Sequence, residues 1–247
     1  MVTEPAPTQA NGEPAPRKTA TGRYCVVIPA LDAEKTIGAV VRGLKPYGVG
    51  ILVIDDGSRD RTAAIASNAG ALVISHLTNR GKGCALRTGF EHALRTGYDG
   101  VITLDADGQH DPAEIPRFIR EGELQHAGLV LGDRMGHLDP MPPIRRWTNR
   151  LMSAVVSVVA RQPIPDSQCG YRLIRKELLA HLPLRSQRFE IETEIIFGAA
   201  AKRWKIISLP IQSHYQQDHR SHIRPARETL RFVALVARYL GRVPRRR

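Results

Sequence analysis

The sequence predicts an α/β protein with a mostly parallel central sheet, helices on both faces and a single domain. Two observations lead to this prediction. In the first half of the chain, short apolar runs of strand length alternate with segments of helical spacing, and such alternation is typical of a parallel sheet. In addition, 247 residues with 42% hydrophobic content are enough for one large core.

Four strands and three helices are expected in the first half. The strands cover residues 24–28, 51–54, 71–75 and 101–104, and the helices cover 36–44, 62–69 and 82–95. In parallel sheets, ligands bind beyond the carboxyl ends of the strands. We therefore expect the segments that follow three of these strands, at Pro29 to Asp32, Asp55-Asp56 and Asp105 to Asp107, to line one crevice.

The second half of the chain has a less regular pattern. Helices are expected at 112–126, 147–160, 189–203 and 224–240, and the first of them has a proline in its first turn. Residues 128–131 predict a short strand, residues 166–171 a polar loop, and residues 205–210 an edge strand. The predicted domain spans 23–224, with a tail at each end.

Composition argues against several classes of protein. The three cysteines, Cys25, Cys84 and Cys169, are far apart and lack Cys-x-x-Cys spacing, which argues against a disulfide framework and a zinc site. Residues 1–22 are rich in Pro, Ala and Thr and predict a disordered tail. The longest apolar stretches, 151–160 and 230–240, are short of the roughly 20 residues that span a membrane. A soluble or peripheral protein is expected.

Positive charge is concentrated at the C-terminal end. The net charge is +12, and the segment from Arg220 onward holds nine arginines against one acidic residue, Glu228. Residues 225–247 therefore predict a basic amphipathic helix with an arginine tail. Such asymmetry indicates an anionic partner, which could be a membrane surface, a phosphorylated substrate or nucleic acid. No aromatic pattern interleaves the arginines, so nucleic acid is not expected.

Asp105 and Asp107 are the most informative pair in the chain. They directly follow an apolar strand, and Gln109 and His110 come next. Two carboxylates at a strand end can hold one divalent cation, and hard oxygen ligands favour Mg²⁺ or Mn²⁺. A turn with acidic caps is the structural alternative.

Other polar groups have weaker signals. Gly81-Lys82-Gly83 lacks the spacing of a phosphate-binding P-loop and is interpreted as a flexible helix entrance. On a helix, Glu190 and Glu194 share one face and Glu192 does not. The histidines at 214, 219 and 222 match no zinc pattern.

Five motifs in order support a family assignment. They are Pro29-Ala-Leu-Asp32-Ala-Glu34, Asp55-Asp56-Gly57-Ser58, Asp105-Ala-Asp107-Gly-Gln-His, Gly-Asp-Arg134, and Asp166-Ser-Gln-Cys-Gly170-Tyr-Arg172. Together they resemble the family-2 glycosyltransferases of the GT-A fold, in the subgroup typified by dolichyl-phosphate and polyprenyl-phosphate sugar synthases. The similarity runs from about residue 24 to residue 240.

The resemblance implies roles for particular residues. Pro29, Leu31, Ile54 and Asp56 would contact the nucleoside of a nucleotide-sugar donor. Asp105, Ala106 and Asp107, the DxD motif, would contact the diphosphate and a metal, with Gln109 a further ligand. Arg134 would reach the donor phosphates or sugar, and Arg172 would face the acceptor phosphate. Where the subgroup has an acidic residue, this chain has Ala33, so the contact shifts to Asp32 or Glu34. His222 stands where a donor-binding lysine is usual.

The expected activity is inverting transfer of a sugar from GDP-mannose or a UDP-sugar to a polyprenyl phosphate. A hydroxyl acceptor is the alternative, and it would need a carboxylate base, for which Glu194 or Glu192 is the candidate. A protein that binds nucleic acid and a sugar-phosphate nucleotidylyltransferase are further alternatives. The resemblance and the basic tail predict a cytoplasmic enzyme that is peripheral on the membrane and serves the cell envelope.

Overall fold

The computed structural model describes residues 23–136, 143–212 and 225–244. One seven-stranded sheet runs through the molecule in the order β3-β2-β1-β4-β6-β5-β7. Its strands are β1 (Tyr24–Ala30), β2 (Gly50–Asp55), β3 (Leu72–Ser75), β4 (Gly100–Thr103), β5 (Leu129–Asp133), β6 (Arg172–Arg175) and β7 (Ile206–Pro210). All neighbouring pairs are parallel except those that β6 makes with β4 and β5. The predicted α/β class and the mostly parallel sheet are confirmed.

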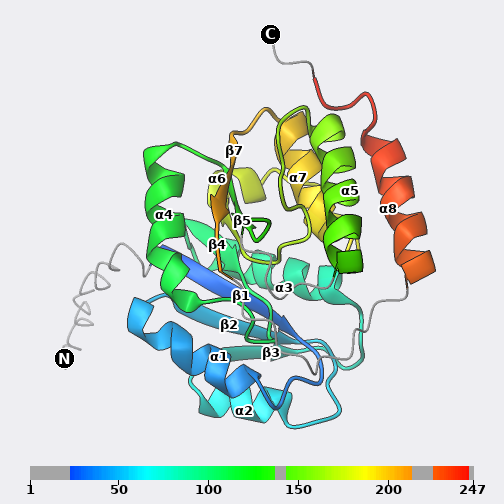
Figure 1. The fold of residues 1–247 in the computed structure, drawn as a ribbon. Helices are drawn as coiled ribbons and strands as arrows, with labels where there is room; N and C mark the ends of the chain where they lie inside the picture. Colours follow the sequence, from blue (N-terminus) through cyan, green and yellow to red (C-terminus); the bar gives the residue numbers. More distant parts are fainter. Residues whose placement is uncertain (1–22, 137–142, 213–224, 245–247) are drawn as a thin grey trace, which may run out of the picture.

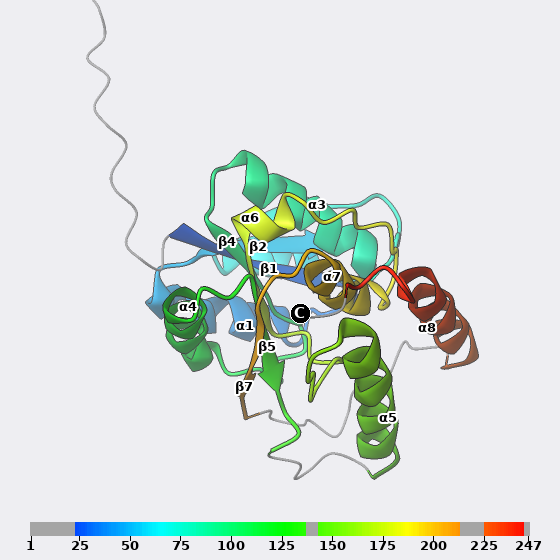
Figure 2. The ribbon, with the colours of Figure 1, turned by 90° about the horizontal axis from the view of Figure 1, so that it is seen from above.

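Helices cover both faces of the sheet (Figures 1 and 2). They are α1 (Ile37–Leu44), α2 (Thr62–Asn68), α3 (Lys82–Arg95), α4 (Ile115–Leu124), α5 (Pro143–Ala160), α6 (Lys176–Leu179), α7 (Ile191–Ala201) and α8 (Pro225–Tyr239), with short 3₁₀ helices η2 (Lys45–Tyr47) and η3 (Pro112–Glu114). One buried apolar cluster joins the sheet to α3, α5, α7 and α8, and a second joins the opposite face to α1, α2 and α4.

Alternation along β1 explains how one strand serves both layers. Cys25 and Val27 belong to the cluster under α3, whereas Val26 and Ile28 belong to the cluster under α1. Successive side chains of a strand point to opposite faces, so a strand that is buried on both sides reads as a continuous apolar run. This is why the strand could be located from the sequence.

The sequence did not predict β6 and α6. Arg172–Arg175 is four residues long and has an arginine at each end, which reads as an extension of the preceding polar loop. It becomes a strand because β4 and β5 provide hydrogen-bonding partners on both sides. This antiparallel insertion fixes where Arg172 lies.

Three other predictions concern the chain ends and the cysteines. The predicted disordered tail, 1–22, lies outside the described residues. All three cysteines are free and buried. Among the residues that the structure describes, no helix combines the length and the apolar character needed to cross a membrane.

Candidate functional site

The carboxyl ends of β1, β2 and β4 lie side by side, because β1 pairs in parallel with both other strands. Side chains tie the segments that follow them. Thr36 Oγ1 donates a hydrogen bond to the carbonyl of Ala106 at 2.6 Å, which joins the segment after β1 to the segment after β4. The backbone N–H of Asp32 donates to Ser58 Oγ at 2.9 Å, which joins the segments after β1 and β2. The structure thus brings the three predicted strand ends together.

The segment after β1 has a tight geometry. Asp32 has a positive φ of 49°, a conformation that asparagine and aspartate tolerate better than most residues. Its carboxylate accepts a hydrogen bond from the N–H of Arg59 at 2.8 Å, and Glu34 pairs with Arg61. Pro29 and Leu31 are partly exposed here. These four candidate nucleoside contacts therefore border the same edge of the sheet.

Ile54 and Asp56 are placed differently from the expectation. The side chain of Ile54 is fully buried in the cluster under α3, so only its backbone is available to a nucleoside. Asp56 is also buried and accepts hydrogen bonds from the N–H groups of Arg80 (2.9 Å) and Gly81 (2.7 Å), and it contacts His76 Nδ1 at 2.7 Å. Asp56 therefore fixes the start of α3.

The start of α3 delivers Lys82 to the site. Lys82 Nζ lies 2.6 Å from Asp105 Oδ1 and 2.6 Å from Glu192 Oε1. Burial by itself would lower the pKa of Lys82, but the two carboxylates outweigh it and raise that pKa well above its usual value. A permanent positive charge therefore lies beside the first aspartate of the DxD motif. The flexible helix entrance proposed from the sequence contains this central cation.

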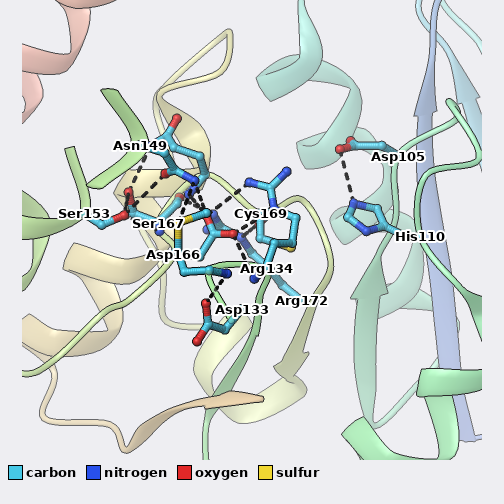
Figure 3. Close-up of polar contacts among 12 residues, drawn as sticks. Asp105, His110, Asp133, Arg134, Asn149, Ser153, Asp166, Ser167, Cys169 and Arg172 are labelled. Carbon is cyan, nitrogen blue, oxygen red and sulfur yellow. Dashed lines mark hydrogen bonds and ion pairs between the residues drawn. The ribbon is translucent and has the colours of Figure 1, made fainter. Parts of the chain in front are cut away.

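Asp105 is enclosed from two further directions (Figure 3). His110 Nε2 lies 3.9 Å from its Oδ2, and a Cβ atom on Gly170 would overlap its carboxylate. Burial acts to raise the pKa of Asp105, but Lys82 and His110 outweigh it, so the pKa lies well below its usual range. The pairing with Lys82 therefore favours the ionised form of Asp105.

The donor atoms fit a metal that arrives with a diphosphate. The side chains of Asp105 and Asp107 are partly exposed, whereas no group of three or more His, Cys, Asp or Glu within the described ranges is arranged to hold an ion by itself. Magnesium is often bound by one or two carboxylates together with substrate phosphates. Gln109, the third predicted ligand, is partly exposed next to Asp107, and its N–H donates to that carboxylate at 3.0 Å.

Arg134 is held by a buried carboxylate (Figure 3). Its Nε and Nη2 lie 2.7 and 3.1 Å from the two oxygens of Asp166, and Asn149 Nδ2 donates to the same carboxylate at 3.0 Å. Burial acts to raise the pKa of Asp166, but Arg134 outweighs it and holds that pKa below its usual range. This bidentate pair fixes the guanidinium of Arg134 after β5.

Comparisons with known proteins identify the family of this chain. The model of the family described as "Glycosyl transferase family 2" matches residues 25–182. The chain belongs to this family. It is 30% identical to the UDP-N-acetylglucosamine–dolichyl-phosphate N-acetylglucosaminyltransferase of Methanococcus voltae, over 78% of this chain and 86% of that protein. It is 29% identical to the polyprenol monophosphomannose synthase of Mycolicibacterium smegmatis, over 82% of each chain.

A solved structure shows the same fold. Glucosyl-3-phosphoglycerate synthase from Mycobacterium tuberculosis, in complex with Mn²⁺, uridine diphosphate and phosphoglyceric acid, superposes with a TM-score of 0.65. Sequence identity is 22%, and the match covers 90% of this chain and 79% of that one. The predicted GT-A fold of a family-2 glycosyltransferase is confirmed.

Two predicted site residues of this glycosyltransferase have mainly structural contacts. Arg172 is 1% exposed, and its guanidinium donates to the carbonyls of Cys169, Ser167 and Glu192. This geometry argues against the expected direct contact with an acceptor phosphate. Glu194 is 1% exposed, and its carboxylate accepts hydrogen bonds from the N–H groups of Arg185 and Ser186. Of the two candidate bases, the geometry favours Glu192.

The remaining site residues divide into three groups. Ala106 is buried between Asp105 and Asp107. His222 lies outside the described residues. The sequence did not predict the ion pairs of Asp166 with Arg134 and of Glu192 with Lys82. For Asp166 the available signal was its place in the fifth motif, and for Glu192 it was an acidic residue at an otherwise apolar helix start.

The Arg134–Asp166 pair makes a prediction about stability. Arg134→Met leaves a buried carboxylate unpaired, so the free energy of unfolding at pH 7 should fall by about 3–5 kcal/mol. Because pairing lowers the pKa of Asp166 in the folded state, its contribution exists above the unfolded pKa of about 4 and is lost as pH falls below it. Urea unfolding should therefore show a constant deficit from pH 7 to about pH 5 and a shrinking deficit as pH falls below about 4.

A surface pair provides the control for this prediction. Arg120 pairs with Glu121 while its side chain is 65% exposed, so Arg120→Met should change stability by less than about 1 kcal/mol. Equal losses in the two variants would contradict the assignment of a buried clamp.

Proposed function

We propose that this glycosyltransferase moves a sugar, with inversion, from a nucleotide-diphosphate sugar such as GDP-mannose or a UDP-sugar to a polyprenyl phosphate or a related lipid phosphate. The observation that carries the proposal is the arrangement at the end of β4, where Asp105 is ion-paired with Lys82 and Asp107 follows two residues later. Such a site suits a leaving diphosphate. The names of two relatives support the acceptor class, because one contains dolichyl phosphate and the other polyprenol monophosphomannose.

Each residue at this edge has a task in the proposed reaction. Asp105 and Asp107 would hold one Mg²⁺ or Mn²⁺, which supplies charge neutralisation on the departing diphosphate. Lys82 would approach the diphosphate as a fixed cation, and Arg134, oriented by Asp166, would add a second. Pro29, Leu31 and the loop around Asp32 would receive the nucleoside. The acceptor oxygen would then attack the anomeric carbon of the sugar from the opposite face. The bond between that carbon and the diphosphate would break, and the diphosphate would leave.

The acceptor's protonation decides whether a base is required. A phosphate monoester carries about −1.5 to −2 charges at neutral pH, so its oxygen attacks without losing a proton to the enzyme. Glu192 is ion-paired to Lys82 and would then serve to orient that lysine. With a hydroxyl acceptor, Glu192 would instead have to take the proton.

We also propose that the enzyme works at an anionic membrane surface on the cytoplasmic side. Ten large apolar side chains are exposed among the described residues, and seven of them lie on α5 or at α8: Ile144, Trp147, Leu151, Val158, Leu230, Val233 and Leu240. The two helices contact each other and run side by side in both views (Figures 1 and 2). Arg150, Arg238 and Arg242 are exposed on or beside them, as anionic lipids require.

The diphosphate assignment is tested by Asp107→Ala. A screen of radiolabelled GDP- and UDP-sugars against polyprenyl phosphate, with Mg²⁺ or Mn²⁺, should find one active donor. The variant should lose about 10²–10³-fold in kcat/KM because an electrostatic contact to the leaving group is removed. Asp111, which caps η3 by accepting from the N–H of Ala113, provides the control. Asp111→Ala should cost about 1 kcal/mol of stability and keep its activity. Full activity of Asp107→Ala would refute the assignment.

Glu192→Gln distinguishes the two acceptor classes. Gln has nearly the same shape as Glu but cannot take a proton. With a lipid phosphate we expect less than about a tenfold fall in kcat, whereas with a hydroxyl acceptor the fall should reach about 10²–10⁴-fold. Glu194→Gln removes a buried carboxylate from the same helix and controls for effects of folding. If kcat falls by the larger factor in Glu192→Gln but not in Glu194→Gln, the acceptor is a hydroxyl group and not a lipid phosphate.

Flotation with anionic liposomes tests the membrane surface. Replacing Leu230 and Val233 by Ser removes exposed apolar area without touching the core. The partition coefficient should fall at least about tenfold, because each inserted side chain contributes about 1.5 kcal/mol. Leu72 and Leu124 are exposed to similar extents elsewhere, and their replacement by Ser should leave flotation unchanged. Equal effects of the two double variants would contradict the proposed surface.

A further inference from the structure

A cavity lies between α8 and the segment that leads into α7. Its volume is about 250 Å³. Three arginines, Arg185, Arg231 and Arg238, line it together with Glu190, and Ala234 and Leu235 form an apolar part of the wall. The reaction proposed at Asp105 uses none of these residues.

The wall facing α7 is rigidly held. Glu194 Oε2 accepts from the N–H groups of Arg185 at 3.0 Å and Ser186 at 2.8 Å. Arg238 Nη1 lies 3.8 Å from Glu194 Oε1. The same carboxylate therefore fixes the segment on one side of the cavity and approaches a guanidinium on the other. A cavity whose charged wall is fixed in advance binds a ligand with less loss of entropy.

Charge and polarity define what fits this cavity. Three guanidinium groups and the carboxylate of Glu190 line the cavity, and Glu194 approaches Arg238 from behind the wall. Positive charge is still in excess, by three guanidinium groups to two carboxylates, and guanidinium is well suited to phosphate. Glu190 Oε2 is buried and has no hydrogen-bond partner among the described residues. A phosphate diester without a hydroxyl on phosphorus has nothing to donate to this oxygen. A phosphate monoester, whose second pKa is about 6, can keep a proton for it.

The apolar wall indicates that the phosphate is attached to a hydrocarbon chain. Ala234 and Leu235 line the cavity, and on the same helix Leu230 and Val233 are exposed next to them. A ligand whose phosphate lies among the arginines can therefore continue along the outer surface of α8. Free inorganic phosphate would leave that surface unused.

The cavity is also close to the reaction site. The backbone of Ser186 and Gln187 packs so tightly against the start of α3 that a Cβ atom on Gly83 would overlap it. The next residue back along α3 is Lys82, which contacts Asp105. One chain segment thus separates the arginines from the cation at the proposed diphosphate site.

We propose that the cavity formed by Arg185, Arg231, Arg238 and Glu190 binds the phosphate monoester of a lipid, which is either a waiting acceptor that has to leave the cavity before its phosphate can attack the sugar or an anionic lipid of the surrounding membrane. The inference rests on the proposed function for its lipid surface. It adds a phosphate-binding site outside the DxD site, in which the chain of the ligand follows α8.

The test is titration of the full-length protein with soluble lipid phosphates below their micelle concentration. Dihexanoyl phosphatidic acid represents membrane lipid, and farnesyl phosphate represents an isoprenoid acceptor. We expect both to bind more tightly than inorganic phosphate and than dihexanoyl phosphatidylmethanol, which is a diester with no hydroxyl group. The tighter of the two monoesters identifies the source of the ligand. Equal binding of inorganic phosphate or of the diester would overturn the proposal.

Two variants distinguish binding in the cavity from non-specific electrostatic attraction to the protein surface. Arg231→Gln with Arg238→Gln removes two charges, and Ala234→Phe fills the cavity without changing charge. Each should weaken monoester binding at least tenfold. Arg95→Gln with Lys202→Gln removes two exposed charges elsewhere and should change binding less than twofold. Thermal unfolding of every variant verifies folding. If Ala234→Phe binds like the unmodified protein, the cavity is not the site.

Sugar transfer measured on the same preparations keeps the two proposals apart. If the unmodified protein transfers no sugar but its monoester binding depends on Arg231, Arg238 and Ala234, the proposed function fails and the cavity site stands. If sugar is transferred and monoester binding is the same in all variants, only the cavity proposal fails.

Discussion

The ion pairs of Lys82 hold the proposed reaction site together. The ammonium group joins Asp105, at the end of β4, to Glu192, at the start of α7, so a single charge connects two halves of the fold that are distant in sequence. Removing either carboxylate would leave the partly buried ammonium group of Lys82 with one counter-charge in place of two, which is unfavourable. Placement of the DxD motif therefore depends on α3 and α7 as much as on the sheet.

Hydrogen bonds between two buried side chains and the backbone orient these charges. Asp56 accepts hydrogen bonds from two backbone N–H groups at the start of α3. Arg172 donates hydrogen bonds to carbonyls of both the 166–171 loop and α7. Neither side chain is exposed. Both residues belong to motifs that the resemblance assigns to ligand contact. Here their hydrogen bonds go to the backbone that holds the ligand-facing residues, which is how rigid sites are built.

The surface that we propose to meet a membrane is built from helices that are apolar on more than one side. On α8, Leu235 and Tyr239 pack into the core while Leu230 and Val233 are exposed. A helix that only covers a soluble core needs one apolar stripe. The additional apolar stripe and the arginines of α8 place the surface proposed to meet lipid next to the cavity proposed to bind the lipid's phosphate. The two proposals concern adjacent faces of the same helix.

The strands, the long helices and the family could be predicted because each depends on local sequence. Continuous apolar runs such as 24–28 predict buried parallel strands, and five short motifs in order predict the glycosyltransferase fold. Only the tertiary structure decided which polar groups meet. The sequence placed Lys82 in a flexible helix entrance, and the resemblance placed Arg172 at the acceptor phosphate. The pairing of β6 buries Arg172, and the approach of α7 to α3 brings Glu192 to Lys82. Contacts between residues 20 to 110 positions apart leave no periodic trace in the sequence, because each depends on how complete elements pack.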